Sequence, residues 1–263
     1  MRLVDSHCHL DFRDFDGDRE AALERAAQAG VQRIIIPAVD LQTSRAGITL
    51  ANQHALISCA VGVHPNSATT WQARTPGELR DLAGKPGVVA IGEIGLDYYR
   101  DRAPRSLQLG VLRAQLDLAV ELGRPVIIHT RNASEQARDC MSDTLEVLSA
   151  YQGRLSGVLH SFSGNLEEAQ QALALGFMIG ITGPVTFKKA VELRQVVAAL
   201  PLEQLLVETD APFLSPHPLR GKRNEPAYVR HVVEKIAEIH QRSPEEVANK
   251  TSENARRLFQ WSS

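Results

Sequence analysis

Short runs rich in β-branched residues recur along the chain, and each is followed by a longer segment with helical periodicity. There are eight such runs in 263 residues, roughly 33 residues per repeat. The expected strands are Leu3–Asp5, Arg33–Ile36, Ile57–Val63, Val88–Ile91, Pro125–Ile128, Gly157–Leu159, Met178–Ile181 and Leu205–Val207. This alternation predicts parallel strands joined by right-handed helical crossovers.

Several of the intervening segments have clear helical signals. Residues 105–123 and 226–240 place apolar side chains three and four positions apart, which predicts amphipathic helices. Asn165 and Ser243 are placed to cap the first turns of two further helices. The repeat number and the chain length favour a closed (β/α)8 TIM barrel formed by residues 1–263 as a single domain. An open doubly wound sheet is the alternative, but the glycine-rich phosphate loop expected after its first strand is missing.

Composition narrows the class of protein. The net charge is −2, from 29 basic and 31 acidic residues, which excludes nucleic-acid binding through a global basic field. The three cysteines form no CxxC pair, which favours a reducing compartment. Neither a signal peptide nor an apolar run of membrane-spanning length is present. We therefore expect a cytoplasmic monomer that does not associate with membranes.

Polar residues that suit metal ligation follow most of the expected strands. They are His7, His9, His64, Glu93, His129, His160, Glu208 and Asp210. In a (β/α)8 barrel the carboxyl ends of all strands meet at one face, where such barrels build their active sites. The distribution therefore predicts a single site at that face.

The His7-Cys8-His9 segment has a direct geometric interpretation. Side chains alternate along a strand, so His7 and His9 point to one side and could hold one metal ion. Cys8 then points away, as a small buried residue rather than a ligand. Two histidines at this spacing are equally compatible with a structural pair, and only their combination with the later strand ends favours a metal.

Later strands supply the remaining candidates. Glu93, His129 and His160 each close an apolar strand, and together they predict a second metal site in which Glu93 offers one oxygen to each of two ions. Asp210 is placed to contact metal and to accept a proton from an activated water. Because side chains alternate along a strand, Glu208 is expected on the same face as Asp210. It is either a residue that orients a ligating histidine or a structural carboxylate.

This donor set suits two divalent ions per chain. Imidazole and carboxylate ligands fit Zn, Mn, Fe, Ni or Co, and fit Mg less well, so the sequence does not distinguish the metal. Two ions with a water between them would generate a hydroxide near neutral pH. The loop that contains Arg220, Lys222 and Arg223 would suit a phosphate, and Arg131 and His64 are further candidates for substrate contact.

These motifs resemble the TatD family of metal-dependent deoxyribonucleases, which belong to the amidohydrolase-like barrels. The matching stretches run in order along nearly the whole chain. They are residues 4–11 (VDSHCHLD), 62–65 (GVHP), 92–99 (GEIGLDYY), 125–131 (PVIIHTR), 160–164 (HSFSG), 206–212 (LVETDAP) and 220–226 (RGKRNEP).

The resemblance implies a two-metal hydrolase that cleaves DNA phosphodiester bonds, often from the 3′ end. One ion would be held by His7, His9, Glu93 and Asp210, and the other by Glu93, His129 and His160. We expect Asp210 to act as the general base beside the bridging Glu93, and His64, Arg131 and Lys222 to position the phosphate. The near-neutral charge favours single-stranded DNA or 3′ ends over tight duplex binding.

Two alternatives remain open at this stage. The same metal site could hydrolyse a small phosphoester, a lactone or an amide, and the basic loop argues only for phosphate over a neutral amide. A metal-stabilised binding module is the second alternative. It would have a closed coordination shell, which the spread of ligands over several strands does not favour.

Overall fold

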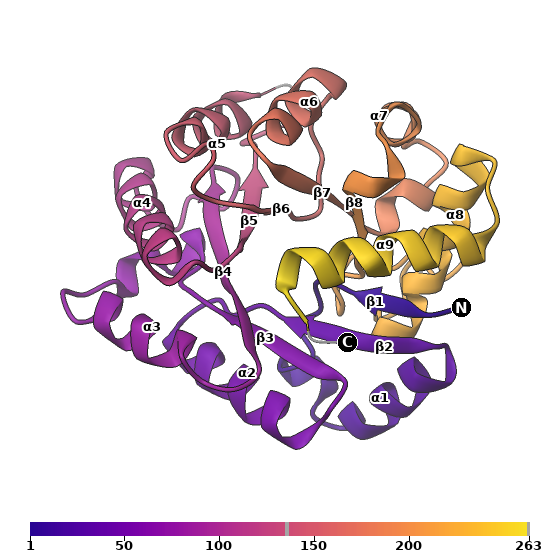
Figure 1. Cartoon of the computed structure of the whole chain (residues 1–263), viewed down its shortest axis with the longest axis horizontal. Coiled ribbons are helices and arrows are strands. Elements are labelled where there is room, and N and C mark those ends of the chain that lie inside the picture. Colours follow the sequence, from indigo (N-terminus) through magenta and orange to yellow (C-terminus); the bar gives the residue numbers. More distant parts are fainter. Residues whose placement is uncertain (135–136, 262–263) are drawn as a thin grey trace. The chain divides into compact units, whose positions relative to one another are not determined.

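The computed structural model describes residues 1–134 and 137–261. Strands and helices alternate along this chain (Figure 1). The strands are β1 (Leu3–Asp5), β2 (Val31–Ile36), β3 (Ile57–Val61), β4 (Val88–Asp97), β5 (Val126–Arg131), β6 (Gly157–Leu159), β7 (Phe177–Ile181) and β8 (Leu205–Val207). They follow one another in the sheet in chain order. This order defines the (β/α)8 fold and differs from that of a doubly wound sheet, whose strand order reverses at a switch point.

The described part of the chain contains nine α-helices, of which α1 to α7 connect consecutive strands and α8 and α9 follow β8. They are α1 (Arg19–Gln28), α2 (Leu41–Gln53), α3 (Thr75–Ala83), α4 (Arg105–Leu122), α5 (Asp139–Ser149), α6 (Leu166–Ala174), α7 (Val191–Ala199), α8 (Val229–His240) and α9 (Pro244–Phe259). The expected caps are present, because Asn165 Oδ1 accepts from the Glu168 N–H at 2.9 Å and Ser243 Oγ from the Glu246 N–H at 3.1 Å. None of these helices is long and apolar enough to cross a membrane.

The chain divides into two compact units, and one of them contains both ends of the described chain. This first unit combines Met1–Ile36, Ser161–Ala169 and the chain from Ile179 onward. In it β1 pairs with β2 and β7 pairs with β8, all parallel. The Ser6 N–H donates to the Val207 carbonyl at 3.1 Å and joins β1 to β8, and α9 lies against β1 (Figure 1).

The second unit contains Pro37–His160 and Gln170–Met178. Here β3, β4, β5 and β6 form consecutive parallel pairs. All ten residues of β4 are buried. The interpretation of residues 1–263 as one domain stays a prediction.

The fourth strand is longer than predicted, and Glu93 therefore lies inside it rather than after its end. The register advances three residues from Ile91 to Ile94, while β5 advances only two. A β-bulge of this kind bends a strand and redirects a side chain. At Gly95, φ is +148°, and a Cβ atom would lie 2.0 Å from the His129 carbonyl oxygen. Only glycine allows β4 to approach β5 so closely.

Candidate metal-binding clusters

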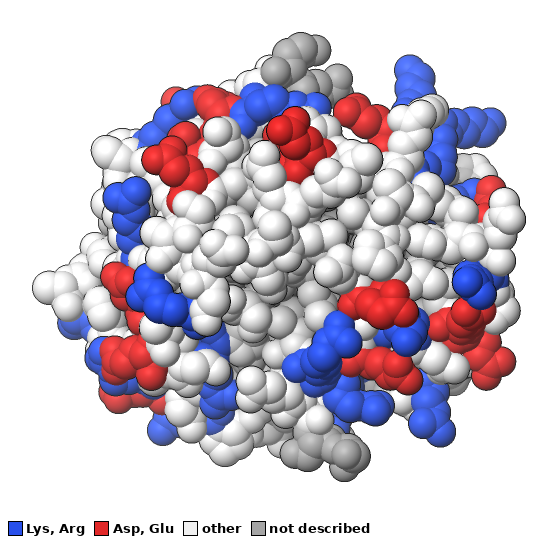
Figure 2. All heavy atoms as spheres, turned by 45° about the horizontal axis from the view of Figure 1, so that its top comes forward, with Lys and Arg blue, Asp and Glu red and all other residues white. Residues whose placement is uncertain are grey.

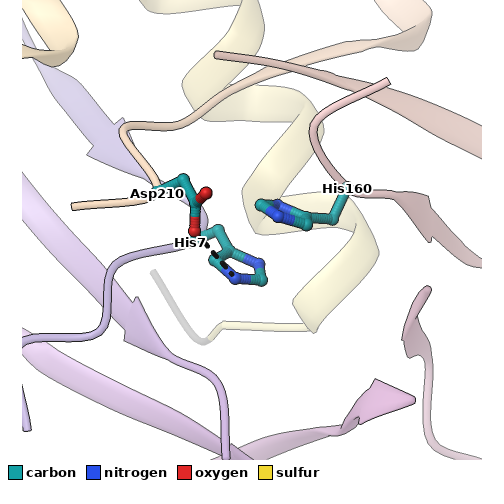
Figure 3. A group of neighbouring side chains, drawn as sticks. All are labelled: His7, His160 and Asp210. Carbon is teal, nitrogen blue, oxygen red and sulfur yellow. Dashed lines mark ion pairs between the residues drawn. The ribbon is translucent and has the colours of Figure 1, made fainter. Parts of the chain in front are cut away.

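Three side chains of the first unit converge, and we call them the His7 cluster: His7, His9 and Asp210. The Nε2 atoms of His7 and His9 are 3.3 Å apart, and Asp210 Oδ1 lies 3.7 Å from the first and 3.5 Å from the second. Figure 3 shows the Asp210 carboxylate directed at the His7 ring. Ligands bound to one tetrahedral zinc ion at about 2.1 Å lie about 3.4 Å from one another. The donor atoms and their spacing therefore fit a divalent metal.

The backbone explains why these three side chains meet. The segment after β1 continues between β2 and the segment after β8, because the Cys8 N–H donates to the Ile35 carbonyl and the His9 N–H to the Ala211 carbonyl. Cys8 is fully buried, as expected for the residue between two histidines that face the other way. The Asp210 N–H donates to the His7 carbonyl at 2.9 Å. The two ligand-bearing segments are thus fixed side by side by main-chain hydrogen bonds.

Asp5 fixes the same segments through its side chain, a role that we did not predict. Its Oδ1 accepts from the Thr209 N–H at 2.9 Å, and its Oδ2 from the Thr209 hydroxyl at 2.6 Å. Burial raises the pKa of Asp5 to about 8, although the hydrogen bonds from Thr209 act in the opposite direction. An acidic residue that closes an apolar strand was the available signal, because a buried carboxyl group needs hydrogen-bond partners.

The second unit contains the Glu93 cluster: Glu93, His64, His129 and His160. Glu93 Oε1 lies 2.8 Å from His129 Nδ1, 3.6 Å from His64 Nε2 and 4.0 Å from His160 Nε2. One carboxylate oxygen is therefore shared by three imidazoles. Glu93, His64 and His129 form a group whose geometry could hold a metal ion.

His64 is kept neutral and in one tautomer. Burial lowers its pKa to about 3, and the neighbouring His129 acts in the same direction. Its Nδ1 accepts from the Asn66 N–H at 3.0 Å, so Nε2 carries the hydrogen. His64 thus presents an N–H donor beside Glu93.

Asp97 is a further residue of this region without a predicted role. Its Oδ2 lies 3.2 Å from His129 Nε2 and accepts from Asn66 Nδ2 at 3.0 Å, and its Oδ1 accepts from the Tyr99 and Arg100 N–H groups. Burial alone would lower the pKa of His129, but Asp97 and Glu93 outweigh it and raise the pKa to about 9. The last residue of β4, Asp97, therefore holds the ring of His129, which lies inside β5 and not after its end as predicted.

Glu208 is fully buried and connects two other segments of the first unit. It accepts from the Ser161 N–H at 2.5 Å and from the Ser6 hydroxyl at 3.4 Å. Ser161 follows His160 in the chain, and Ser6 precedes His7. Glu208 thus holds Ser161 and Ser6, which are the chain neighbours of the predicted ligands His160 and His7.

The expected phosphate-binding cations lie in different environments. Arg223 pairs with Asp18 at 2.6 Å and is occupied by a structural contact. The guanidinium of Arg220 lies 4.2 Å from the centre of the Phe187 ring, and that of Arg131 lies 4.1 Å from the centre of the Tyr99 ring. Lys222 is exposed, and its carbonyl accepts a hydrogen bond from the Ser215 hydroxyl. Arg131 and Lys222 therefore remain accessible to a substrate.

One cavity of the first unit, about 770 Å³ in volume, lies elsewhere. It is lined by residues at the start of β1 and β2 and along α9, including Arg2, Arg33, Glu253 and Arg256. None of the predicted site residues lines it.

Histidines and carboxylates at the ends of (β/α)8 strands define a class of metal-dependent hydrolases. The sequence matches the family described as TatD related DNase over residues 4–260. It is 40% identical over 258 residues to an uncharacterized metal-dependent hydrolase, YabD of Bacillus subtilis, with 98% of each chain covered. It is 39% identical over 263 residues to the 3′-5′ ssDNA/RNA exonuclease TatD of Yersinia pseudotuberculosis, with 98% of this chain and 99% of that protein covered.

One solved structure supports the same family, and a more distant one shares the fold. The crystal structure of YjjV, a TatD homolog from Escherichia coli, superposes with a TM-score of 0.91 at 34% identity and covers 99% of both chains. The phosphotriesterase homology protein of Escherichia coli, at 16% identity and a TM-score of 0.69, shares the fold. The chain therefore belongs to the TatD family of metal-dependent hydrolases that act on ester bonds.

Proposed function

We propose that this hydrolase is a 3′-5′ exonuclease acting on single-stranded DNA, with two divalent ions per chain. The observation that carries the metal assignment is the convergence of His7, His9 and Asp210 at 3.3 to 3.7 Å. The substrate assignment is supported by the relatives named as ssDNA/RNA exonucleases, such as that of Yersinia pseudotuberculosis.

The proposed ligand sets follow the resemblance to the family. One ion would be held by His7, His9, Glu93 and Asp210, and the other by Glu93, His129 and His160. The two ions, when bound, polarise the phosphoryl group and lower the pKa of the attacking water. Glu93 contributes a carboxylate that is almost fully buried, so its charge is little screened by solvent.

The chain's own groups move the proton and place the phosphate. Asp210 accepts the proton of the attacking water as the bond between water oxygen and phosphorus forms. The bond from phosphorus to the 3′ oxygen of the preceding nucleotide breaks, and solvent protonates that oxygen. The Nε2–H of His64, fixed by the hydrogen bond that Nδ1 accepts from the Asn66 N–H, donates to a phosphoryl oxygen. Arg131 and Lys222 supply positive charge to neighbouring phosphates.

A 5′-labelled single-stranded oligonucleotide tests this proposal. Protein is stripped with chelator, reloaded separately with Mn²⁺, Mg²⁺ or Zn²⁺, and compared with Glu93→Gln and with the surface control Glu121→Gln. Glu121 is half exposed and pairs with Arg80. We expect a ladder that shortens from the 3′ end in the reloaded wild type and in Glu121→Gln, and no ladder in Glu93→Gln.

Two results would contradict the proposal. Cleavage that persists in Glu93→Gln would indicate a contaminating nuclease. Metal-dependent hydrolysis of a small phosphodiester or a lactone, without cleavage of the strand, would keep the metal centre and replace the substrate by a small molecule.

A further inference from the structure

Two aromatic side chains stand out on the surface of the described chain. The exposed large apolar residues are Met1, Tyr99, Leu107, Leu166, Val191 and Phe213. Tyr99, at 53% exposure, and Phe213, at 50%, are the only aromatic ones in that group. Tyr99 lies two residues after the end of β4, and Phe213 lies three residues after Asp210. Single exposed apolar residues are common, but both aromatic ones follow strands that supply predicted metal ligands.

Tyr99 is built into the surroundings of the Glu93 cluster. Its N–H donates to Asp97 Oδ1 at 3.0 Å, and Asp97 in turn holds His129. The guanidinium of Arg131, two residues after His129, lies 4.1 Å from the centre of the Tyr99 ring. A half-exposed ring and a cation are thus held together beside a predicted ligand.

Phe213 is built into the surroundings of the His7 cluster in a comparable way. Its N–H donates to the Asp210 carbonyl at 2.8 Å, and its own carbonyl accepts from Asn224 Nδ2 at 2.7 Å. Its ring meets Phe12 edge to face at 6.2 Å between centroids, and Phe12 stacks on His9 at 4.5 Å. A continuous set of rings therefore leads from a predicted ligand to the exposed Phe213.

We propose that Tyr99, in the second unit, and Phe213, in the first, are each a stacking position for a base of a single-stranded nucleic acid. The proposal rests on the proposed function. It names the feature by which this hydrolase would prefer a single strand to a small phosphoester. Proteins that bind single strands without sequence preference stack successive bases on aromatic side chains, because every base has a π face.

Electrostatic attraction alone would not make the protein prefer a single strand to a small phosphoester. The chain carries a net charge of −2, and on the face shown in Figure 2 the basic side chains are interspersed with acidic ones. Attraction to the phosphates is therefore limited to local cations such as Arg131. Stacking supplies affinity that does not depend on a basic field.

The test compares two strands of equal length and equal charge, one of oligothymidine and one abasic. Both carry phosphorothioate linkages at the 3′ end, so binding is measured on the metal-loaded protein without turnover. Fluorescence anisotropy gives both dissociation constants for the wild type, Tyr99→Leu and Phe213→Leu. Leucine keeps apolar surface and removes the π face, and thermal melting verifies the fold. Val191→Ala, which removes another exposed apolar side chain, is the matched control.

We expect the wild type to bind the oligothymidine strand more tightly than the abasic one. Each leucine variant should weaken oligothymidine binding about tenfold, which is within the range of one lost stacking contact, and should reduce the preference for the base-containing strand. Val191→Ala should keep the wild-type ratio. An unchanged ratio in both leucine variants, or a wild type that binds the two strands equally, overturns the proposal. Normal binding preferences without cleavage of an unmodified strand would instead reject the exonuclease and keep the stacking positions.

Discussion

The Nε2 atom of His129 lies 3.2 Å from the Oδ2 atom of Asp97, while the Nδ1 atom of the same ring lies 2.8 Å from Glu93. A histidine ligand commonly donates its second ring nitrogen to a carboxylate, which fixes the ring and its tautomer. Asp97 is itself fixed by Asn66 and by two main-chain N–H groups. His129 is therefore oriented before any metal binds.

Removal of the Asp97 carboxylate should weaken metal binding without removing a ligand. We expect Asp97→Ala to lower metal affinity about 10- to 100-fold, the usual effect of losing such a partner, and Asp97→Asn to lower it less because an amide oxygen still accepts from the ring. Competition with a fluorescent chelator measures both affinities. An affinity equal to that of the wild type in Asp97→Ala would show that this hydrogen bond does not position the ligand.

Bound metal should stabilise the folded chain, because the clusters exist only when the strands are assembled. A ligand present at one hundred times its dissociation constant stabilises by about 2.7 kcal/mol. For a chain of 263 residues, that energy corresponds to a rise in Tm of about 5 °C. Differential scanning fluorimetry with and without EDTA measures it. The shift should be smaller in His9→Ala, and a shift of equal size in this variant would exclude His9 as a ligand.

Asp5 and Thr209 provide a test of how the His7 cluster is assembled. Asp5→Ala leaves the buried Thr209 N–H without its partner, and we expect the free energy of unfolding to fall by about 2 to 4 kcal/mol. Thr209→Val keeps the main-chain contact but removes the hydroxyl contacts with Asp5 and with the Ala211 N–H, and it should cost about 1 to 3 kcal/mol. Urea denaturation of both variants and of the double variant gives the coupling energy. Additive effects would show that the two residues do not act together.

The pairing of Asp18 with Arg223 and Arg25 predicts a pH dependence of stability. These arginines hold the pKa of Asp18 well below its ordinary value of 3.8. The folded state therefore binds this proton less readily than the unfolded state, so the stabilisation is present above about pH 4 and is lost as the pH falls further. Asp18→Asn should be less stable than the wild type at pH 7, and the difference should shrink toward pH 3 and at high salt. A difference independent of pH would argue against the ion pair.

The same pairing separates the roles of two neighbouring cations. Lys222 is exposed, whereas Arg223 is held by Asp18. Lys222→Ala should weaken binding of a single strand and reduce the salt dependence by roughly one phosphate contact, with little change in Tm. Arg223→Ala should mainly lower Tm. If Arg223→Ala reduces the salt dependence and Lys222→Ala does not, the assignment of the phosphate contact is reversed.

Much of the fold was predictable from local pattern. Six of the eight strands were predicted to within two residues at each end, because short β-branched runs are a strong signal. The exceptions are β5, which continues through His129 to Arg131, and β4, where residues 92–97 extend the strand through a bulge. Its cause is the close approach of Gly95 to the His129 carbonyl, a contact between strands that periodicity does not reveal.

The residues that support the clusters were harder to predict than the clusters. His7, His9 and Asp210 follow strands, and their positions alone brought them to attention. Asp5 and Asp97 lie in the same motifs, but their partners Thr209 and His129 are distant in sequence, so their hydrogen bonds could not be anticipated. The same holds for Arg223, whose contact with Asp18 spans 205 residues.

We expect strand cleavage by this protein to require two divalent ions. Titration of metal-free protein with Mn²⁺ tests it most directly, with bound metal and the rate of 3′ shortening of a labelled single strand measured in the same samples. We predict no activity without metal and a rate that reaches its plateau at two equivalents per chain. A plateau at one equivalent, or shortening by the metal-free protein, would rule out a requirement for two ions.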